Sequence, residues 1–572
     1  MPTAPEILSQ AVEQALQAVV GPDNAGPALI KPCVDPSHGD YQANGIMAVA
    51  KKLRRNPQEL AREVIARLDV GAVSEPPAVA GAGFINFKLT PSFVSDQIAA
   101  AARDERLGVP RAAQPRTVVI DFSSPNVAKP MHVGHIRSTI IGDCLARVLR
   151  FLGHRVITDN HIGDWGTQFG MLIVGWKKFR DDNALRADPI GELERLYKLV
   201  YERGERDPAA REEAKAELVK LQQGEPENRA IWQQIIDLSR HEFDKTYKRL
   251  GVAFDHTLGE SFYNPMLKDV VTDLLQKGIA RESEGAQCVF FEDNPELKSA
   301  APLIIQKSDG AYLYGTTDLA TIRYRIEQWH PAEIIYVTDA RQQLHFKQVF
   351  ATARKWQKNC PELRHVYFGS ILGEDGKPLK TREGAPVKLS ALLDEAEERA
   401  LAVVKEKNPD LPAVIQKQIA RAVGIGAVKY ADLSQNRTTD YVFSWPKMLA
   451  MTGNTAPYMQ YAYVRVQSIF RKAAGAVEAP KITLEHPEEM KLAKHLLRFG
   501  EVLQELTDDD KPNWLTAYLY DLAGKFSVFY DNCPVLQSPE PTRSSRLQLC
   551  RLTADIIERG LELLGIDVIE QM

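Results

Sequence analysis

The chain has 572 residues, of which 44% are hydrophobic, 26% charged and 8% aromatic, as in ordinary globular proteins. This length exceeds what one hydrophobic core supports, so we expect three or four domains. A formal net charge of −4 gives no global sign of a nucleic-acid-binding protein, so any polyanion would have to be held by local basic faces.

Cysteine use and hydropathy narrow the class of protein further. The six cysteines are scattered without a CxxC pair, which argues against a disulfide framework or a structural zinc and favours a reducing cytoplasm. No uncharged apolar run is long enough to span a bilayer, and the amphipathic N-terminus lacks the layout of a secretory signal. We therefore expect a cytoplasmic protein without a membrane span.

Residues 1–110 predict an α+β N-terminal domain. Helical patterns cover 6–19, 43–53 and 57–68, and one alternating stretch predicts a strand over 82–90. The sequence RAAQPR, over 111–116, is typical of a linker.

Residues 111–180 predict the first half of a parallel-sheet domain. A β-branched run over 117–122 predicts a buried strand, apolar residues at helical spacing over 136–152 predict a helix, and 154–160 predict a second strand. Strand–loop–helix–strand units of this kind build parallel sheets. A glycine-rich loop, GDWGTQFG, follows over 163–170.

Residues 181–305 leave this rhythm and predict a charged, helical insertion. The second half of the sheet resumes within 306–400, with expected elements at 333–340 (strand), 342–356 (helix), 365–372 (strand) and 373–384 (loop). From 411 onward, within a region over 401–572, we find only helical patterns. The expected fold is an α/β catalytic domain with a Rossmann-type doubly wound parallel sheet and a helical insertion, an α+β N-terminal domain and an all-α C-terminal region.

The loop after the first strand carries His132-Val133-Gly134-His135. A metal site is a poor interpretation, because the histidines are not at i, i+4 on a settled helix face and no nearby carboxylate or cysteine completes a ligand set. A Ser–His pair is also poor without a Gly-x-Ser-x-Gly elbow, and ordinary polar loop residues stay an alternative. The position between a strand end and a helix start favours ATP, with imidazole N–H groups stabilising charge at the α-phosphate and Gly134 leaving room for a base or ribose.

HVGH resembles the HIGH signature of class I aminoacyl-tRNA synthetases, and SSPNVAKPMHVGHIRSTIIGD followed by GDWGTQFG resembles the arginyl-tRNA synthetases in particular. The resemblance extends through KSDGAYLYGTTDLA, DARQQLHFKQ, LSQNRTTDYVFSW and GNTAPYMQYAYVRV, so it covers nearly the whole chain. It implies ATP-dependent activation of L-arginine and transfer of arginine to the terminal adenosine of tRNA(Arg), with Mg²⁺ carried by the phosphates and no metal site of the protein. It also implies a DALR-type anticodon-binding region in the C-terminal helices and a tRNA-contacting N-terminal domain.

The second class I signature, KMSKS, does not occur as such. The equivalent loop is Lys377-Pro378-Leu379-Lys380-Thr381-Arg382, and which of Lys377, Lys380 or Arg382 matches the second signature lysine stays open. The resemblance implies that Lys129, three residues before the first histidine, replaces that lysine and stabilises the pentacoordinate α-phosphate. The catalytic candidates are Lys129, His132, Gly134, His135, Lys377 and Lys380, and the ATP-binding candidates are His132, Gly134, His135, His345 and Lys380.

A guanidinium group requires negative charge in planar geometry. Tyr314 and Asp318 are four residues apart, so they share one face if the segment is helical. The resemblance implies that these two hold the guanidinium, with Glu260 as a second acid. For the ammonium and carboxylate of arginine it adds Asp121, Ser123, Asn126, His161 and Gln342. Helix capping, surface acids and turn chemistry are the alternatives.

Basic and aromatic residues alternate in YMQYAYVRVQSIFRK, which suits unpaired RNA bases and phosphates, although an aromatic core with a solvated basic stripe fits equally well. The tRNA-binding candidates are Tyr458, Gln460, Tyr461 and Arg465, in a protein expected to be a monomer. The rival interpretations are a class I synthetase for another amino acid, a small nucleotidylyltransferase and a non-catalytic tRNA-binding paralogue.

Overall fold

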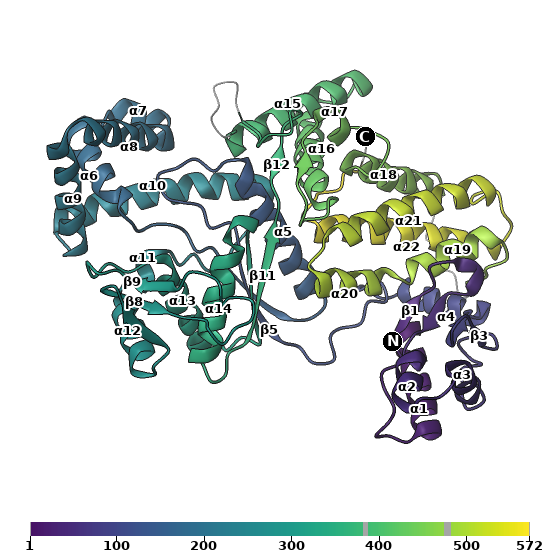
Figure 1. Cartoon of the computed structure of the whole chain (residues 1–572). Helices are drawn as coiled ribbons and strands as arrows, with labels where there is room; N and C mark the ends of the chain where they lie inside the picture. Colours follow the sequence, from purple (N-terminus) through teal and green to yellow (C-terminus); the bar gives the residue numbers. More distant parts are fainter. Residues whose placement is uncertain (1, 381–386, 474–481, 571–572) are drawn as a thin grey trace. The chain divides into compact units, whose positions relative to one another are not determined.

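The computed structural model describes residues 2–380, 387–473 and 482–570. The chain forms two compact units (Figure 1). The first contains Met1–Arg111, Ala462–Val502 and Tyr518–Arg559, and the second contains Ala112–Tyr461, Leu503–Ala517 and Gly560–Met572. None of the helices in the described part of the chain is both long and apolar enough to cross a membrane.

The second unit is built around a four-stranded parallel sheet in the order β11-β10-β5-β6. Its strands are β5 (Thr117–Asp121), β6 (Arg155–Asp159), β10 (Glu333–Asp339) and β11 (Glu362–Phe368). All four overlap the strands predicted from the sequence. Strands β5, β6 and β10 carry apolar, β-branched runs that are buried in the sheet, whereas in β11 the buried residues are Leu363, Val366 and Phe368. The expected doubly wound catalytic fold is confirmed.

The direction of winding reverses between β5 and β10. Helix α5 (Val133–Phe151) leads from β5 to β6, whereas α14 (Gln343–Trp356) leads from β10 to β11 on the other side. In such sheets the ligand crevice lies outside the carboxyl ends of the strands at this switch point. The loops that follow Asp121 and Asp339 lie at this switch point.

A buried arginine fixes helix α5 within the second unit. Arg137 is 1% exposed and its Nε lies 3.1 Å from the Asp432 carboxylate, which belongs to α16 (Ala413–Leu433). Its Nη1 donates to the carbonyl of Gly369, just after β11, at 2.6 Å. The helix that begins at the histidine motif is therefore tied to the segment that leads into the KMSKS-like loop.

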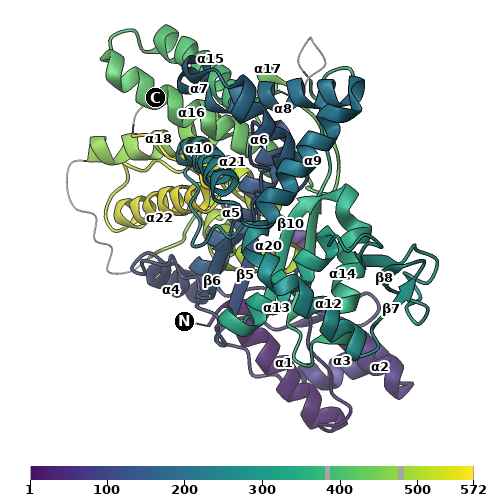
Figure 2. The ribbon, with the colours of Figure 1, turned by 90° about the vertical axis from the view of Figure 1, so that its left-hand side faces the viewer.

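The insertion is only partly helical, which corrects the prediction. Helices α6 (Gln168–Phe179), α8 (Pro189–Arg206) and α9 (Pro208–Gln222) pack together (Figure 2), followed by the long α10 (Pro226–Leu250). The other insertion helices are α7 (Asp182–Ala187), α11 (Glu260–Tyr263), η2 (Asn264–Met266) and α12 (Leu267–Gln276). An antiparallel sheet then forms from β7 (Ala280–Ser283), β8 (Ala286–Val289) and β9 (Leu303–Gln306).

The C-terminal half of the second unit is mainly helical. It contains α13 (Tyr314–Trp329), η3 (Ala340–Gln342), α15 (Leu389–Lys407), α16 and α17 (Trp445–Met448). Two-residue strands β12 (Ile371–Leu372) and β13 (Tyr441–Val442) pair in parallel. Strand β13 contradicts the expectation of helices alone after 411, because two residues carry no detectable period.

The first unit combines the N-terminal domain with C-terminal helices. Its antiparallel sheet has the order β1-β2-β4-β3, with β1 (Ile30–Pro32), β2 (Tyr41–Ala43), β3 (Ala78–Ala80) and β4 (Phe84–Phe87). Only the last was predicted, because the others are three residues long. The N-terminal helices are α1 (Ala4–Val20), η1 (Pro36–His38), α2 (Ile46–Leu53), α3 (Pro57–Ile65) and α4 (Pro91–Ala101). The C-terminal helices, some of which continue into the second unit, are α18 (Ala456–Ala473), α19 (Pro487–Leu496), α20 (Phe499–Asp509), α21 (Asn513–Asn532) and α22 (Thr542–Leu563).

Candidate active site

The loop after β5 is held in an unusual backbone conformation. Three non-glycine residues have positive φ: Ser123 (73°), Ser124 (47°) and Ala128 (61°). Such residues cost about 1–3 kcal/mol each and persist where the surroundings fix them. Here the Ser123 N–H donates to the Ser138 hydroxyl at 2.8 Å, and the Ser124 N–H donates to the Asn160 side-chain oxygen at 3.0 Å. The loop therefore presents the histidine motif in one conformation.

Asp121 anchors this loop through a buried ion network. Arg325 is 0% exposed and its Nη2 donates to Asp121 Oδ2 at 2.6 Å and to Asp159 Oδ2 at 2.8 Å. The Ser124 hydroxyl donates to the other oxygen of Asp121 at 3.0 Å. The prediction that Asp121 contacts the substrate ammonium is therefore corrected: its carboxylate is buried and already engaged on both oxygens.

Ser123 is likewise buried rather than presented to a ligand. Its hydroxyl lies 2.8 Å from the Tyr247 hydroxyl and accepts a hydrogen bond from the Thr139 hydroxyl at 2.8 Å. The prediction that Ser123 contacts arginine is wrong in this structure, because its hydroxyl is satisfied by these two partners. Ser124, which the sequence argument passed over, is the half-buried serine of the loop.

The loops after β5 and β6 lie side by side. Asn126 is exposed and its backbone forms a parallel bridge with Gly163. A Cβ at Gly163 would lie 2.3 Å from Asn126 Oδ1, so a larger residue there would require the Asn126 side chain to move. His161, two residues earlier, has a buried Nδ1 without a hydrogen-bond partner among the described residues. Asn126 and His161 therefore lie in neighbouring loops at one edge of the sheet, as predicted.

Both motif histidines carry their proton on Nε2 when neutral. His132 caps α5 and its Nδ1 accepts from the Gly134 N–H at 3.1 Å, while His135 Nδ1 accepts from the His132 N–H at 3.0 Å. Their ring centroids are 3.9 Å apart. Burial, with the neighbouring His132, lowers the pKa of His135 to about 3, and burial, with Arg341, lowers the pKa of His132. At neutral pH the pair therefore offers two Nε2–H donors, which suits an anionic ligand.

The exit of the KMSKS-like loop pairs with the histidine motif, which the sequence did not reveal. The Val133 N–H donates to the Val387 carbonyl, and the Leu389 N–H donates to the Met131 carbonyl, each at 2.9 Å. Lys377 and Lys380 are exposed, and Arg382 lies outside the described residues. The loop therefore returns to the ATP-side motif, although the choice among its basic residues stays a prediction.

Lys129 is an exposed lysine on the ATP-side loop. Its Nζ lies 5.9 Å from the ring centroid of Tyr197 in α8. Cations at this distance from an aromatic face are weakly attracted to it. The ammonium therefore lies on the loop that precedes the histidine motif, and its catalytic role stays a prediction.

An acidic cluster forms the other end of the site. Tyr314 and Asp318 lie in the first turns of α13, as expected, and Tyr314 is 67% exposed. Glu260 begins α11, and burial, with Asp318 and Asp164 nearby, raises the pKa of its carboxyl to about 8. Burial, with Glu260, also raises the pKa of Tyr314. The three residues predicted to hold a guanidinium are therefore brought together from two separate segments.

Asp164, within GDWGTQFG, fixes Glu260 in place and was missed as a site residue. Its carboxylate accepts from the Ser261 N–H and hydroxyl, both at 2.7 Å. A Cβ at Gly259 would lie 2.2 Å from that carboxylate. The glycine-rich loop therefore supports the start of α11. Its acidic residue, Asp164, was the feature of the sequence that could have pointed to this role.

His345 contacts the acidic cluster, and its assignment to ATP stays a prediction. Its Nε2 lies 2.5 Å from Asp318 Oδ2. Burial alone would lower the pKa of His345, but the hydrogen bond and charge of Asp318 outweigh it and raise the pKa. Gln342 is exposed at the end of η3, and Arg341 beside it is one cause of the lowered pKa of His132. The turn over 340–345 thus links the histidine motif to the acidic cluster.

The four tRNA-binding candidates on α18 differ in accessibility. Tyr461 is 44% exposed, Tyr458 is half-buried, and Arg465 lies 3.7 Å from Asp531 with its side chain 34% exposed. Gln460 is 0% exposed and its Nε2 donates to the Asp567 carbonyl at 2.7 Å. Its burial contradicts the prediction that Gln460 contacts tRNA directly.

No group of three or more His, Cys, Asp or Glu side chains within residues 2–380, 387–473 and 482–570 is arranged to hold a metal ion. The donors of the site are instead imidazoles, a lysine and backbone groups at a helix start. Such groups suit phosphates, whose own oxygens are the usual ligands of Mg²⁺.

Three family models match the chain in order. The arginyl tRNA synthetase N terminal domain matches residues 6–89, the class I (R) tRNA synthetase catalytic domain matches 97–445, and the DALR anticodon binding domain matches 459–572. The arginine–tRNA ligases of Citrobacter koseri and Escherichia coli (strain SMS-3-5) are each 48% identical over 576 residues, which cover 99% of both chains.

Solved structures give the same picture. An arginyl-tRNA synthetase from Plasmodium falciparum is similar with a TM-score of 0.86 at 31% identity, over 100% of both chains. The arginyl-tRNA synthetase of Thermus thermophilus has a TM-score of 0.84 at 26% identity, over 99% of this chain and 100% of that one.

Proposed function

The chain belongs to the arginyl-tRNA synthetase family of class I, and on this premise we propose which of its side chains carry each part of the reaction. It is an arginine–tRNA ligase, which activates arginine with ATP and transfers it to tRNA(Arg). The observation that carries the assignment is the half-buried pair of acids, Asp318 and Glu260, near one end of a turn whose other end adjoins the histidine motif.

The acidic cluster binds the guanidinium of arginine. Asp318 offers a carboxylate oxygen that His345 does not occupy, Glu260 supplies the second acid, and the Tyr314 ring covers the planar group. Carboxylates match guanidinium groups in a planar fork. His161, Asn126 and Gln342 are assigned to the ammonium and carboxylate of the amino acid, because the loops after β6, β5 and β10 carry them.

Activation is an in-line displacement at phosphorus. The arginine carboxylate forms a bond to the α-phosphorus of ATP while the bond to the bridging oxygen of pyrophosphate breaks, which yields arginyl-adenylate and pyrophosphate. The Nε2–H groups of His132 and His135 donate to oxygens on which negative charge develops. Mg²⁺ arrives with ATP and is carried by its phosphates.

Transfer then uses the tRNA as the nucleophile. The 2′-hydroxyl of the terminal adenosine attacks the arginyl carbonyl, loses its proton, and AMP leaves with the bonding pair. No protein nucleophile takes part, so positioning and electrostatics supply the catalysis.

Removal of Lys129 is expected to slow activation strongly. Its ammonium lies on the loop that precedes the histidine motif, where it can neutralise the pentacoordinate α-phosphate. We expect Lys129→Ala to lower arginine-dependent ATP–pyrophosphate exchange by about tenfold or more, equivalent to about 1.4 kcal/mol, while Lys129→Arg keeps most of the rate. Lys358→Ala, away from the site, is the control, and a loss below tenfold would refute the role.

Arginine binding is expected to release protons. Near pH 7 the Glu260 carboxyl, with a pKa of about 8, is largely protonated. A bound guanidinium favours the carboxylate of Glu260, so this group loses its proton. Affinity for arginine should therefore rise between pH 6 and pH 8.5.

Calorimetry in buffers of different ionisation enthalpy measures this release. Wild-type enzyme should release about one proton per arginine near pH 7, and Glu260→Gln should release clearly less. Glu282→Gln, an exposed acid on β7, should behave as wild type. Binding without net proton exchange across this pH range would contradict the assignment of Glu260.

The tRNA surfaces follow the domain division. We assign tRNA contacts to the N-terminal domain over 1–110 and to the helical region over 401–572, with Tyr458, Tyr461 and Arg465 on α18 as candidates. We propose that the catalytic domain is divided into 111–180 and 306–400, with the insertion over 181–305. A monomer in the cytoplasm is the proposed state.

A further inference from the structure

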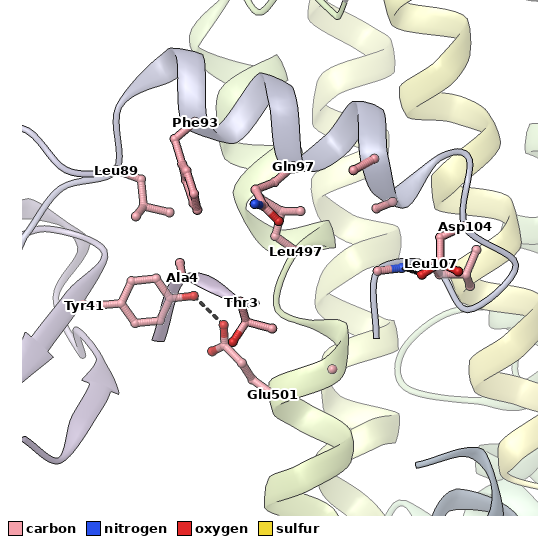
Figure 3. A pocket seen from close by; sticks show the side chains of 14 residues that line it. Thr3, Ala4, Tyr41, Leu89, Phe93, Gln97, Asp104, Leu107, Leu497 and Glu501 are labelled. Atoms are coloured by element: carbon pink, nitrogen blue, oxygen red, sulfur yellow. Dashed lines mark hydrogen bonds between the residues drawn. The ribbon is translucent and has the colours of Figure 1, made fainter. Parts of the chain in front are cut away.

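The N-terminal sheet is tied to the C-terminal helices of the first unit by two consecutive residues. Asp40 Oδ2 lies 2.7 Å from Lys494 Nζ on α19. The Tyr41 hydroxyl donates to Glu501 Oε1 on α20 (Figure 3), over 2.5 Å. Asp40 and Tyr41 belong to the matched N-terminal domain, and Lys494 and Glu501 to the matched anticodon-binding domain. The two bonds therefore join the two domains to which we assign tRNA contacts.

These bonds are shielded from water. Tyr41 is 4% exposed and the Glu501 side chain is 13% exposed, whereas Asp40 and Lys494 are each about one-fifth exposed. Burial, with the charge of Glu501, holds the pKa of Tyr41 well above its usual value, so its hydroxyl stays a donor. Hydrogen bonds to charged groups are roughly twice as strong as neutral ones, and shielding strengthens them further.

The apolar packing around these bonds is incomplete. A cavity of about 190 Å³ remains between α4, α20 and the start of α1 (Figure 3). It is lined by Leu89, Phe93, Gln97, Leu107 and Leu497, and Tyr41 and Glu501 meet at its edge. Side chains that line a void lose dispersion contacts on that side. The hydrogen bonds therefore contribute a larger part of the stability of this domain contact than they would in a filled core.

Asp40 is also hydrogen-bonded within its own domain. The same Oδ2 atom accepts the Leu89 N–H at 2.8 Å, and the Asp40 N–H donates to the Phe87 carbonyl at 2.7 Å. Asp40 is therefore held in place by β4 and by the segment that leads into α4, so its bond to Lys494 ties α19 to these parts of the N-terminal domain.

We propose that Asp40–Lys494 and Tyr41–Glu501 form a two-point clamp that sets the spacing between the two tRNA-contacting domains. The four residues are positioning residues for tRNA and touch neither arginine nor ATP. The proposal rests on the proposed tRNA contacts of both domains. It requires that loss of the clamp weakens tRNA binding while the chemistry of the bound complex is kept.

The decisive variant is Tyr41→Phe, which removes one buried hydroxyl that tRNA cannot reach. We expect the KM for tRNA to rise about fivefold, the order expected from losing a charge-assisted hydrogen bond, with kcat at saturating tRNA and the KM for ATP within about twofold. Glu501→Gln, which keeps an acceptor for Tyr41 but removes its charge, should raise the KM for tRNA by less than Tyr41→Phe does. Lys494→Met should raise the KM for tRNA as Tyr41→Phe does. Lys491→Met is the control and should not, because Lys491 pairs with Glu488 on the same helix.

Thermal melting and hydrogen exchange separate positioning from loss of fold. Exchange should rise in β2 and α19 of Tyr41→Phe without a general rise in the catalytic sheet. If Tyr41→Phe unfolds, Lys494→Met carries the test. The clamp is overturned if the folded variants among Tyr41→Phe and Lys494→Met keep their KM for tRNA within twofold of wild type. It is also overturned if the KM for arginine and kcat change as much as the KM for tRNA. Wild-type exchange with arginine tests the proposed arginine site independently.

Discussion

Asp318→Asn is expected to abolish most arginine activation. The substitution keeps the shape of the side chain but removes the carboxylate charge that we assign to the guanidinium. Loss of one partner of a shielded charge pair costs about 2–5 kcal/mol, so kcat/KM for arginine should fall by about 30-fold to several thousandfold. Arginine-dependent ATP–pyrophosphate exchange measures this directly.

The matched control lies on the same helix. Glu327 is exposed on α13 and lies 3.7 Å from Arg323, so Glu327→Gln should leave the exchange rate unchanged. Asp318→Asn should also remove the upward shift in the pKa of His345, because that shift depends on the Asp318 charge. A decrease in kcat/KM of less than threefold would exclude Asp318 from the guanidinium site.

Arg325→Met is expected to destabilise the catalytic domain strongly. It leaves the Asp121 and Asp159 carboxylates buried beside each other without the cation that both contact. Breaking a buried ion pair from one side typically costs about 3–5 kcal/mol, because the remaining charge stays desolvated. The denaturant midpoint of the catalytic domain should fall accordingly, with the exchange rate falling as the loop after β5 loses its anchor.

Arg323 provides the comparison for this prediction. It lies two residues earlier on α13 with its side chain 22% exposed, and its pair with Glu327 spans 3.7 Å. Arg323→Met should cost under about 1 kcal/mol, as for ordinary surface pairs. An Arg325→Met enzyme as stable as Arg323→Met would show that the buried network does not hold the loop.

Local patterns were enough to predict the strands of the catalytic sheet and the helix face that carries Tyr314 and Asp318. Buried parallel strands give continuous apolar runs, and residues four apart on a helix share a face whatever the surroundings. The position of the HVGH motif at a strand end follows from the same local evidence. These features depend on residues that are close together in the chain, so they can be predicted from a single sequence.

Contacts between distant segments could not be predicted in this way. Arg325 looks like any helical arginine until the sheet brings Asp121 and Asp159 to it, and the hydrogen bond from Gln460 to the Asp567 carbonyl joins residues far apart in the chain. The bond between His345 and Asp318 joins residues 27 apart, so no local pattern shows it. The three-residue strands of the N-terminal sheet are too short to show a period.

The most direct test of the account compares arginine with citrulline, whose neutral urea group replaces the guanidinium. In ATP–pyrophosphate exchange, wild-type enzyme should prefer arginine by a large factor, and Asp318→Asn should lose most of that preference while exchange with citrulline is retained or gained. If Asp318→Asn lowers exchange with both amino acids equally and keeps the preference for arginine, the guanidinium is recognised elsewhere and the central claim is contradicted.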